Sequence, residues 1–318
     1  MRVARDAIHG GAPTPGDGLT RGDAPAPGLT RSEALTRARE RLIRARVDVP
    51  EREAEWILLH ALGIPPVALW SEPHAPIAPD REAVLESLIR RREGREPLQL
   101  ILGEVPFHGV ALAVESGVFL PRPETEELVE LVLLRIAATG ASRGRLLDWG
   151  TGSGAIAVAL AKALPGWTVV AADWSPIARC LAARNAERNG VEARVEVVAG
   201  DFGAPGPVTS GRALFDVVVS NPPYVRRGDI SGLMPEVRDH DPLEALDGGP
   251  DGLDAFRSLA RGMHAWLRTG GLLALEIGAD QADNVLGILS VPIDDARVLP
   301  DRAGHPRYVI GTMRGGGA

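Results

Sequence analysis

A glycine-rich turn between a buried strand and a helix constrains the fold of this chain more than any other feature. The apolar run that ends at Asp148 and Trp149 leads straight into Gly150, Gly152 and Gly154, and an alanine-rich helical pattern starts at once. Glycines in such a turn let the backbone bend sharply and approach a ligand closely, which a Cβ atom would prevent. This succession indicates an α/β fold with a ligand at the carboxyl edge of its sheet.

The rest of the second half of the chain alternates in the same way between strands and helices. Five apolar segments separated by helical segments predict parallel strands. Two more segments near the C-terminus have only a short link, so we expect them to pair antiparallel at one edge. The expected strands are residues 145–149, 168–173, 194–198, 216–220, 272–277, 296–299 and 307–310. The predicted fold class is therefore α/β, with a seven-stranded, mostly parallel, doubly wound sheet.

The first half of the chain divides into segments with different patterns. Apolar residues first recur at helical spacing and then change to a period of two, which predicts strands at residues 100–102 and 110–114. A Gly- and Pro-rich stretch precedes both patterns. The predicted organisation is a disordered tail over residues 1–29, a small helical domain over 30–95, a linking β-hairpin over 96–122 and a catalytic domain over 123–318.

Composition narrows the class of partner. The net charge is -7, which does not suit a protein that clamps long stretches of nucleic acid. The one cysteine, Cys180, excludes an intrachain disulfide, and we interpret it as a small buried apolar residue. No apolar run approaches the roughly 18 residues that span a bilayer, so we expect a cytoplasmic protein without membrane contact. A basic cluster closes the last helical segment of the helical domain and comprises Arg90, Arg91, Arg92 and Arg95. We expect these cations to complement the dipole at the C-terminus of that helix.

The glycine turn by itself is compatible with two cofactors. Asp173 ends the second strand, 21 positions after Gly152, where a carboxylate can accept both hydroxyls of a ribose. Gly150, Gly152 and Ala155 also satisfy the fingerprint of a nicotinamide dinucleotide. Asp148 would oppose a pyrophosphate but would suit the ammonium of a methionine moiety, which favours S-adenosylmethionine. A purely structural turn is the weaker interpretation, because three alternating glycines cost unfolded-state entropy without a packing gain.

A second turn follows the third strand, at residues 200–202. In this fold the position flanks an adenine, so Asp201 could accept from the exocyclic amine and Phe202 could cover the ring. An ordinary strand-end turn with one core aromatic residue explains the same pattern equally well.

The segment Asn221-Pro222-Pro223-Tyr224 follows a buried strand and carries the chemistry. A planar amide or aryl amine is a poor nucleophile, so it must be oriented and its N–H bonds must be held. The Asn221 side-chain oxygen can accept one N–H, and the Pro222 carbonyl, held by successive prolines, can accept the other. Tyr224 offers a flat face for stacking. The alternative, a strand end with a Pro-Pro turn, is disfavoured by the glycine turn upstream.

Further segments extend the pattern over most of the chain: residues 103–109, 120–126, 244–253 and 270–273. In this order, with the two loops, they closely resemble the HemK-type family of release factor glutamine methyltransferases, from about residue 31 to about residue 312. The resemblance implies a Rossmann-like S-adenosylmethionine-dependent methyltransferase sheet behind a helical domain that docks the substrate. It also implies N5-methylation of the glutamine in the Gly-Gly-Gln motif of class 1 peptide chain release factors.

The resemblance also assigns residues to the site. It implies catalytic roles for Asn221, Pro222 and Tyr224, and substrate contacts from Asn221, Pro222, Pro223 and Tyr224. It implies cofactor contacts from Gly150, Thr151, Gly152, Ser153, Gly154, Asp173, Phe202 and Asn221, and no metal ligand. For Arg122 and Glu124, an ion pair or helix cap is as compatible with the pattern as a cofactor contact.

Rival functions come from other classes of protein. An amino-methyltransferase of adenine or cytosine in DNA or RNA uses a similar loop, but it needs a basic groove that this acidic chain lacks. A non-catalytic docking module of the translation apparatus would be expected to have lost Asn221 or a glycine of the turn, and both remain. A nicotinamide dehydrogenase has no use for the Asn-Pro-Pro-Tyr segment.

Overall fold

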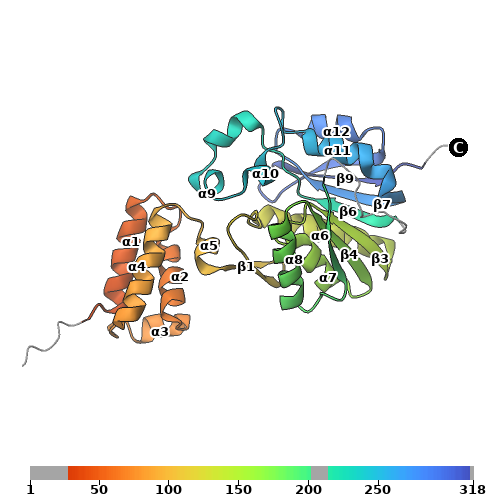
Figure 1. Ribbon diagram of the computed structural model, residues 1–318. Coiled ribbons are helices and arrows are strands. Elements are labelled where there is room, and N and C mark those ends of the chain that lie inside the picture. The colour runs from red at the N-terminus through yellow and green to blue at the C-terminus, as the bar shows by residue number, and fades with distance from the viewer. Residues whose placement is uncertain (1–27, 202–213, 316–318) are drawn as a thin grey trace, which may run out of the picture.

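The computed structural model describes residues 28–201 and 214–315. The tail predicted over residues 1–29 therefore falls almost wholly outside the described residues, and so does Phe202. Figure 1 shows a helical bundle on one side and a sheet flanked by helices on the other. No helix in the described ranges is long and apolar enough to cross a membrane.

Four helices form the bundle around an apolar core of their own (Figure 1). The first begins at a capping box, in which Thr30 Oγ1 accepts from the Glu33 N–H and the Glu33 carboxylate accepts from the Thr30 N–H. The apolar spacing predicts helical structure in this part of the chain, and four helices are found, of which the short third helix was not singled out from the sequence. Their bounds are α1 (Arg31–Arg44), α2 (Pro50–Leu62), α3 (Pro66–Ser71) and α4 (Pro79–Glu93).

The segment after the bundle corrects one prediction. Residues 100–102 were expected to form a strand, but they belong to a short helix, α5 (Leu98–Leu102). Leu98 and Ile101, three positions apart, both reach the core of the bundle, and Gly103 ends the helix at φ 77°. A short apolar run does not distinguish strand from helix. The hairpin itself exists, formed by β1 (Glu104–Phe107) and β2 (Val110–Ala113).

The sheet has seven strands in the order β5-β4-β3-β6-β7-β9-β8. The first five strands of this order are parallel, and β9 lies antiparallel between β7 and β8. This confirms the predicted mostly parallel α/β sheet with an antiparallel pair at one edge. The bounds are β3 (Gly144–Trp149), β4 (Trp167–Asp173), β5 (Val195–Ala199), β6 (Phe215–Ser220), β7 (Leu267–Glu276), β8 (Ile293–Pro300) and β9 (Pro306–Met313).

Helices cover both faces of the sheet. Successive residues of a strand point to opposite faces, so Leu146 packs into one apolar core and Leu147 into the other. Three helices cover the first face and two the second: α6 (Pro123–Thr139), α7 (Ala155–Ala163) and α8 (Pro176–Arg188), then α11 (Asp254–Gly262) and α12 (Ala282–Leu289). Cys180 corrects another prediction, because it lies exposed on the outer side of α8 while Leu181 faces inward.

An insertion (residues 225–253) separates β6 from α11. It contains one 3-10 helix and two short α-helices, which are η2 (Arg227–Gly232), α9 (Pro235–Arg238) and α10 (Leu243–Leu246), and a further 3-10 helix, η3 (Met263–Ala265), precedes β7. In Figure 1, α9 is the part of the insertion that reaches toward the helical bundle.

Ion pairs join α9 to the bundle. Arg92, which is buried, pairs with Glu53 of α2 and, at 3.0 Å, with Glu236 of α9. Arg95 reaches the other carboxylate oxygen of Glu236 at 2.7 Å. The basic cluster does stand in and just after the last turn of α4, as its predicted role requires. Two of its members also connect the bundle to the sheet domain.

Candidate active site

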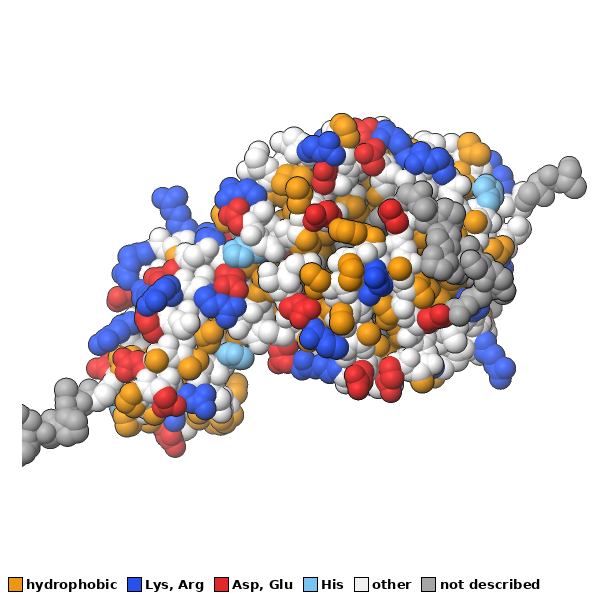
Figure 2. Space-filling model, viewed as in Figure 1, with side chains coloured by type: hydrophobic (Ala, Val, Ile, Leu, Met, Phe, Trp, Pro, Cys, Tyr) orange, Lys and Arg blue, Asp and Glu red, His pale blue; other side chains and the backbone are white. Residues whose placement is uncertain are grey.

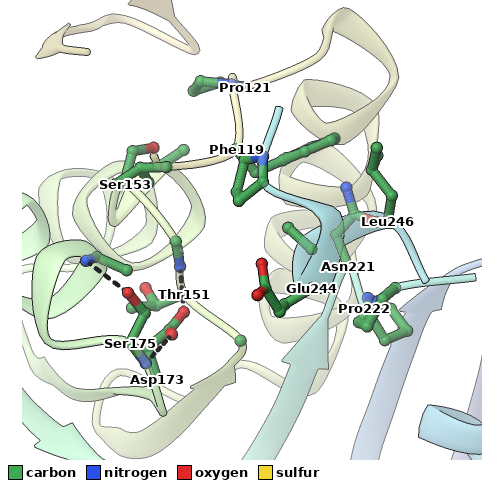
Figure 3. Close-up of a pocket in the computed structure, with 18 of the residues that line it drawn as sticks. Phe119, Pro121, Thr151, Ser153, Asp173, Ser175, Asn221, Pro222, Glu244 and Leu246 are labelled. Atoms are coloured by element: carbon green, nitrogen blue, oxygen red, sulfur yellow. Dashed lines mark hydrogen bonds between the residues drawn. The ribbon is translucent and has the colours of Figure 1, made fainter. Parts of the chain in front are cut away.

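A cavity of about 770 Å³ lies where β3, β4 and β6 end (Figure 3). One wall comes from the glycine loop (residues 150–154) and from Asp173, and another from the acceptor loop (residues 221–224). Because these strands are parallel, their carboxyl ends meet at one edge and bring the two loops together. Figure 3 shows Thr151 and Asp173 on one side of the cavity and Asn221 and Pro222 on the other.

The cavity unites most of the predicted site residues. Those that line it are Gly150, Thr151, Gly152, Ser153, Asp173, Asn221, Pro222, Pro223 and Tyr224. Gly154 is not among the lining residues, and it serves the packing of two helices instead. A Cβ at Gly154 would lie 3.0 Å from the Cα of Ala182 in α8, and its φ is 82°. Phe202 lies outside the described residues, so its predicted role is not addressed by the fold.

Asp148 stabilises the glycine loop from the interior of the protein. Its carboxylate oxygen Oδ2 accepts from the Thr151 hydroxyl at 2.6 Å and from the Ala157 N–H at 3.1 Å. Asp148 is fully buried and does not line the cavity. Burial raises the pKa of its carboxyl to about 7. From the sequence, Asp148 was expected to lie beside the ammonium group of the cofactor. In the structure, its carboxylate instead stabilises the glycine turn through Thr151 and Ala157.

Asp173 joins the glycine loop to β4. One carboxylate oxygen accepts from the Gly152 N–H and the other from the Ser175 N–H, both at 2.9 Å (Figure 3). Burial raises the pKa of this carboxyl, and the two backbone donors oppose the shift. Each oxygen keeps a second lone pair, so the side chain can still accept hydrogen bonds from a ligand in the cavity.

Trp174 is a cavity residue that the sequence analysis did not identify. It follows Asp173, and the residue remains 53% exposed while lining the cavity. A carboxylate and a neighbouring indole ring suit a ribose hydroxyl pair and a purine, respectively. The cavity residues therefore fit a nucleoside. The signal in the sequence was a large aromatic residue directly after a strand-end acid.

Two oxygens of the acceptor loop accept no hydrogen bond from the described part of the chain. The Asn221 amide nitrogen donates to Thr125 Oγ1 at 3.1 Å. Within residues 28–201 and 214–315, neither the Asn221 side-chain oxygen nor the Pro222 carbonyl accepts a hydrogen bond. Both residues line the cavity. The loop therefore offers two acceptors to a ligand.

A buried carboxyl behind the acceptor loop was not singled out from the sequence. Glu276, at the end of β7, accepts from the Thr125 hydroxyl at 2.8 Å and from the Tyr224 hydroxyl at 3.3 Å. Burial raises the pKa of Glu276 to about 7, and burial also raises the pKa of Tyr224. An acid that ends an otherwise apolar strand was the signal in the sequence that could have found it.

Gln281 fixes the backbone of the acceptor loop. Its side-chain nitrogen donates to the Tyr224 carbonyl at 3.0 Å and to the Gly252 carbonyl at 3.1 Å. Its side-chain oxygen accepts from the Gly278 N–H at 3.0 Å. A Cβ at Gly252 would lie 2.5 Å from the Tyr224 carbonyl oxygen, so only glycine permits this approach.

The structure also addresses Arg122 and Glu124. Arg122 forms an ion pair with Asp241, and its guanidinium lies 4.9 Å from the centre of the Phe119 ring. Asp241 also accepts from the Leu120 N–H at 3.3 Å. It therefore links the segment that precedes α6 to the insertion. The structure contains the ion pair, and Arg122 also lines the cavity, so the cofactor contact stays a prediction. The backbone carbonyl of Glu124 accepts from the Tyr308 hydroxyl at 2.7 Å.

Comparison with known proteins shows which family this chain resembles. Residues 33–103 match the PrmC N-terminal domain, and residues 112–234 match the methyltransferase small domain. A release factor glutamine methyltransferase from Geobacter sulfurreducens is 43% identical over 262 residues, which cover 82% of this chain and 89% of that protein. The chain belongs to the release factor glutamine methyltransferase family.

Other relatives of the same name match over a similar extent. The Rhodospirillum rubrum protein is 40% identical over 292 residues, covering 91% of this chain and 87% of its own length. The Deinococcus radiodurans protein is 40% identical over 286 residues, covering 89% and 99%. The resemblance found in the sequence is therefore confirmed. The chain is a methyltransferase that uses S-adenosylmethionine, and the nicotinamide interpretation of the glycine loop is not supported.

Proposed function

We propose that this protein methylates the side-chain amide nitrogen, N5, of the glutamine in the Gly-Gly-Gln motif of class 1 peptide chain release factors. The observation that carries the proposal is the pair of free acceptors in the cavity, the Asn221 side-chain oxygen and the Pro222 carbonyl. A primary amide has two N–H donors on one planar nitrogen, which match two acceptors on one loop. A relative with 43% identity carries the name release factor glutamine methyltransferase, which supports the proposal.

The acceptor loop orients the nucleophile. With both N–H bonds held by Asn221 and Pro222, the amide nitrogen can turn only the face of its plane toward the glycine loop. Tyr224 lines the cavity beside them and can cover the planar group. Bound S-adenosylmethionine supplies a methyl group on a positively charged sulfur. Alignment of this kind can contribute about 7–11 kcal/mol to lowering the barrier.

The opposite wall suits the cofactor. Asp173 can accept the ribose hydroxyls, and Trp174 can stack on the adenine. The glycine loop brings backbone close to the ligand, with Gly150 at φ 76° and Gly152 at φ 56°, where a side chain would be strained. The role of Phe202 beside the adenine stays a prediction.

The helical bundle is proposed as the docking domain for the release factor, with residues 30–95 as its extent. Its ion pairs with Glu236 connect it to α9, and both Val237 of α9 and Leu233 just before this helix line the cavity. A bound factor could thus be held close to the reacting glutamine. Since release factors act on ribosomes, we place the activity in the cytoplasm.

Methylation of DNA or RNA is the alternative that the charge distribution disfavours. On the face shown in Figure 2, basic and acidic side chains are interspersed over both lobes. Arg92 and Arg95, two of the four arginines at the end of α4, are engaged in ion pairs with Glu236. The net charge of -7 gives little attraction to phosphates.

Mass spectrometry of a co-expressed release factor tests the proposal. The Gly-Gly-Gln peptide should gain one methyl group with the native enzyme. It should gain none above background with Asn221→Ala, whose turnover should fall by about a hundredfold or more because the amide is no longer oriented. Purified enzyme should transfer labelled methyl to the factor and not to duplex DNA. Labelled DNA with an unlabelled factor would replace this proposal with the nucleic-acid alternative.

A further inference from the structure

A threonine hydroxyl stands between the acceptor loop and a buried carboxyl. Thr125, near the start of α6, receives the Asn221 amide N–H at 3.1 Å and donates to Glu276 at 2.8 Å. The side chains are well shielded, with exposures of 4% for Thr125 and 1% for Glu276. These three residues come from three different elements, α6, β7 and the loop after β6.

The order of donors and acceptors in this chain has a consequence for Asn221. A hydroxyl carries one proton, and that of Thr125 is directed to Glu276. Only lone pairs of the Thr125 oxygen then face Asn221, so the asparagine must present its NH₂ group to Thr125. Its carbonyl oxygen is left facing the cavity as an acceptor. The reverse orientation would turn an NH₂ group toward the N–H bonds of the substrate, which would repel it.

Glu276 keeps this order in either protonation state. One carboxyl oxygen faces Thr125 and the other faces the Tyr224 hydroxyl at 3.3 Å. A proton on the oxygen beside Tyr224 can be donated to that hydroxyl, so the oxygen beside Thr125 remains an acceptor. Glu276 therefore stands behind two residues of the acceptor loop without lining the cavity itself.

We propose that Glu276, acting through Thr125, fixes the amide orientation of Asn221 and so makes the site selective for a substrate nitrogen that carries N–H bonds. Thr125 and Glu276 are positioning residues, because each acts on the substrate through a residue of the acceptor loop. The proposal rests on the proposed function, since it requires the Asn221 oxygen to accept from the substrate amide.

Thr125→Val tests the proposal with a side chain of nearly the same shape that lacks the hydroxyl. Turnover of the release factor should fall about tenfold or more because Asn221 loses its orientation. The KM for the factor and the dissociation constant of S-adenosylmethionine should stay within about twofold, because the hydrogen bonds of this hydroxyl run to Asn221 and Glu276. Thr125→Ser should rescue turnover, and Thr139→Val, which removes a hydroxyl at the far end of α6, should have no effect.

A double-mutant cycle separates positioning from a general structural role. In the Asn221→Ala background, Thr125→Val should cause no further loss in single-turnover rate, because the group that it orients is absent. Losses that add in the double mutant would overturn the proposal. If Thr125→Val does not fold, Thr125→Ala removes the same hydroxyl without placing a methyl group, and the same cycle applies.

Nuclear magnetic resonance provides a readout that needs no substrate. In the free native enzyme, the Asn221 side-chain NH₂ protons should exchange slowly with solvent, and Thr125→Val should accelerate that exchange about tenfold or more. Equal exchange in both proteins would overturn the orienting role. If the native enzyme fails to methylate release factors while exchange changes as expected, the proposed function fails and the orienting contact stands.

Discussion

The Ser220 hydroxyl donates a hydrogen bond to the Trp149 carbonyl at 2.5 Å. Ser220 is the last residue of β6, directly before the acceptor loop, and Trp149 is the last residue of β3, directly before the glycine loop. Both are buried. This single contact therefore links the two walls of the cavity at the points where their loops begin.

Ser220→Ala should lower turnover by about tenfold while weakening S-adenosylmethionine binding only a few-fold. The lost hydrogen bond is worth about 0.5–1.5 kcal/mol. Without it, the positions of the two loops relative to each other are less well fixed. Steady-state kinetics with release factor and calorimetry with the cofactor measure the two effects. Ser290→Ala is the matched control, because Ser290 also donates to a backbone carbonyl, that of Gly287, but at the end of α12. Unchanged turnover in Ser220→Ala would mean that this contact has no part in catalysis.

Asp173→Ala should weaken S-adenosylmethionine binding by at least about tenfold. The substitution removes an acceptor for the ribose and releases the Gly152 and Ser175 N–H groups. Hydrogen bonds to a charged group contribute roughly 1.5–3 kcal/mol each. Titration calorimetry measures the affinity, and thermal unfolding checks that the fold remains. Asp294→Ala, which removes an exposed carboxylate that pairs with Arg314, should leave the affinity as it is.

Asp148→Asn should change how stability depends on pH. Burial raises the pKa of Asp148 from 3.8 to about 7 in the folded chain, so the folded state binds this proton more tightly than the unfolded state does. The free energy of unfolding therefore falls as pH rises from about 4 to about 7, and the loss is complete above the folded pKa. Asparagine does not titrate, and its side-chain oxygen can still accept from Thr151.

The measurement for Asp148→Asn is urea unfolding of the cofactor-free protein at pH 5 and at pH 8. Relative to the native chain, the variant should gain on the order of 2 kcal/mol between these values. Glu276, whose pKa is raised to about 7 by burial, titrates in the same interval in both proteins, so it cancels in the difference. A constant difference between the two proteins at both pH values would show that Asp148 is already ionised in the fold.

Glu236→Gln should raise the KM for intact release factor several-fold without changing turnover of a short Gly-Gly-Gln peptide. Glu236 pairs with Arg92 and Arg95, so its charge helps to hold the bundle against α9. Removing one partner of a shielded ion pair costs more than breaking an exposed pair, because the remaining charge is left without its partner away from water. Glu115→Gln, which breaks an exposed pair with Arg184, is the control. Equal increases in KM for factor and peptide would locate the effect in the cavity rather than at docking.

The two loops were predictable because each is a continuous motif with a local physical signal. Gly150 and Gly152 mark a turn, and Asn221 with Pro222 marks a rigid strand end. The contacts behind them were not predictable from pattern, since Thr125 and Glu276 are 151 positions apart and meet only after the sheet forms.

Where the structure differs from the sequence-based expectations, the causes are also physical. Residues 100–102 form an apolar run that is compatible with a strand or a helix. The helix forms because it lets Leu98 and Ile101 pack into the core of the bundle. Cys180 lies among alanines and leucines of α8, but the helix turns that position to solvent. Asp148 was placed beside a ligand because it lies just before the glycine loop, but its buried carboxylate accepts from Thr151 and Ala157 instead. A strand alternates its side chains, so adjacent residues have different surroundings.

The glycine loop and the acceptor loop rise from β3 and β6, which are neighbours in the sheet and pair in register from Leu146 with Val217 to Asp148 with Val219. The strands are spaced by about 4.8 Å, as in any sheet. We infer that the separation of methyl donor and acceptor is set largely by the pairing of these two strands. We propose that partner choice, by contrast, rests on the bundle and the insertion. Evolution can therefore alter the protein that is recognised while the distance over which the methyl group moves stays the same.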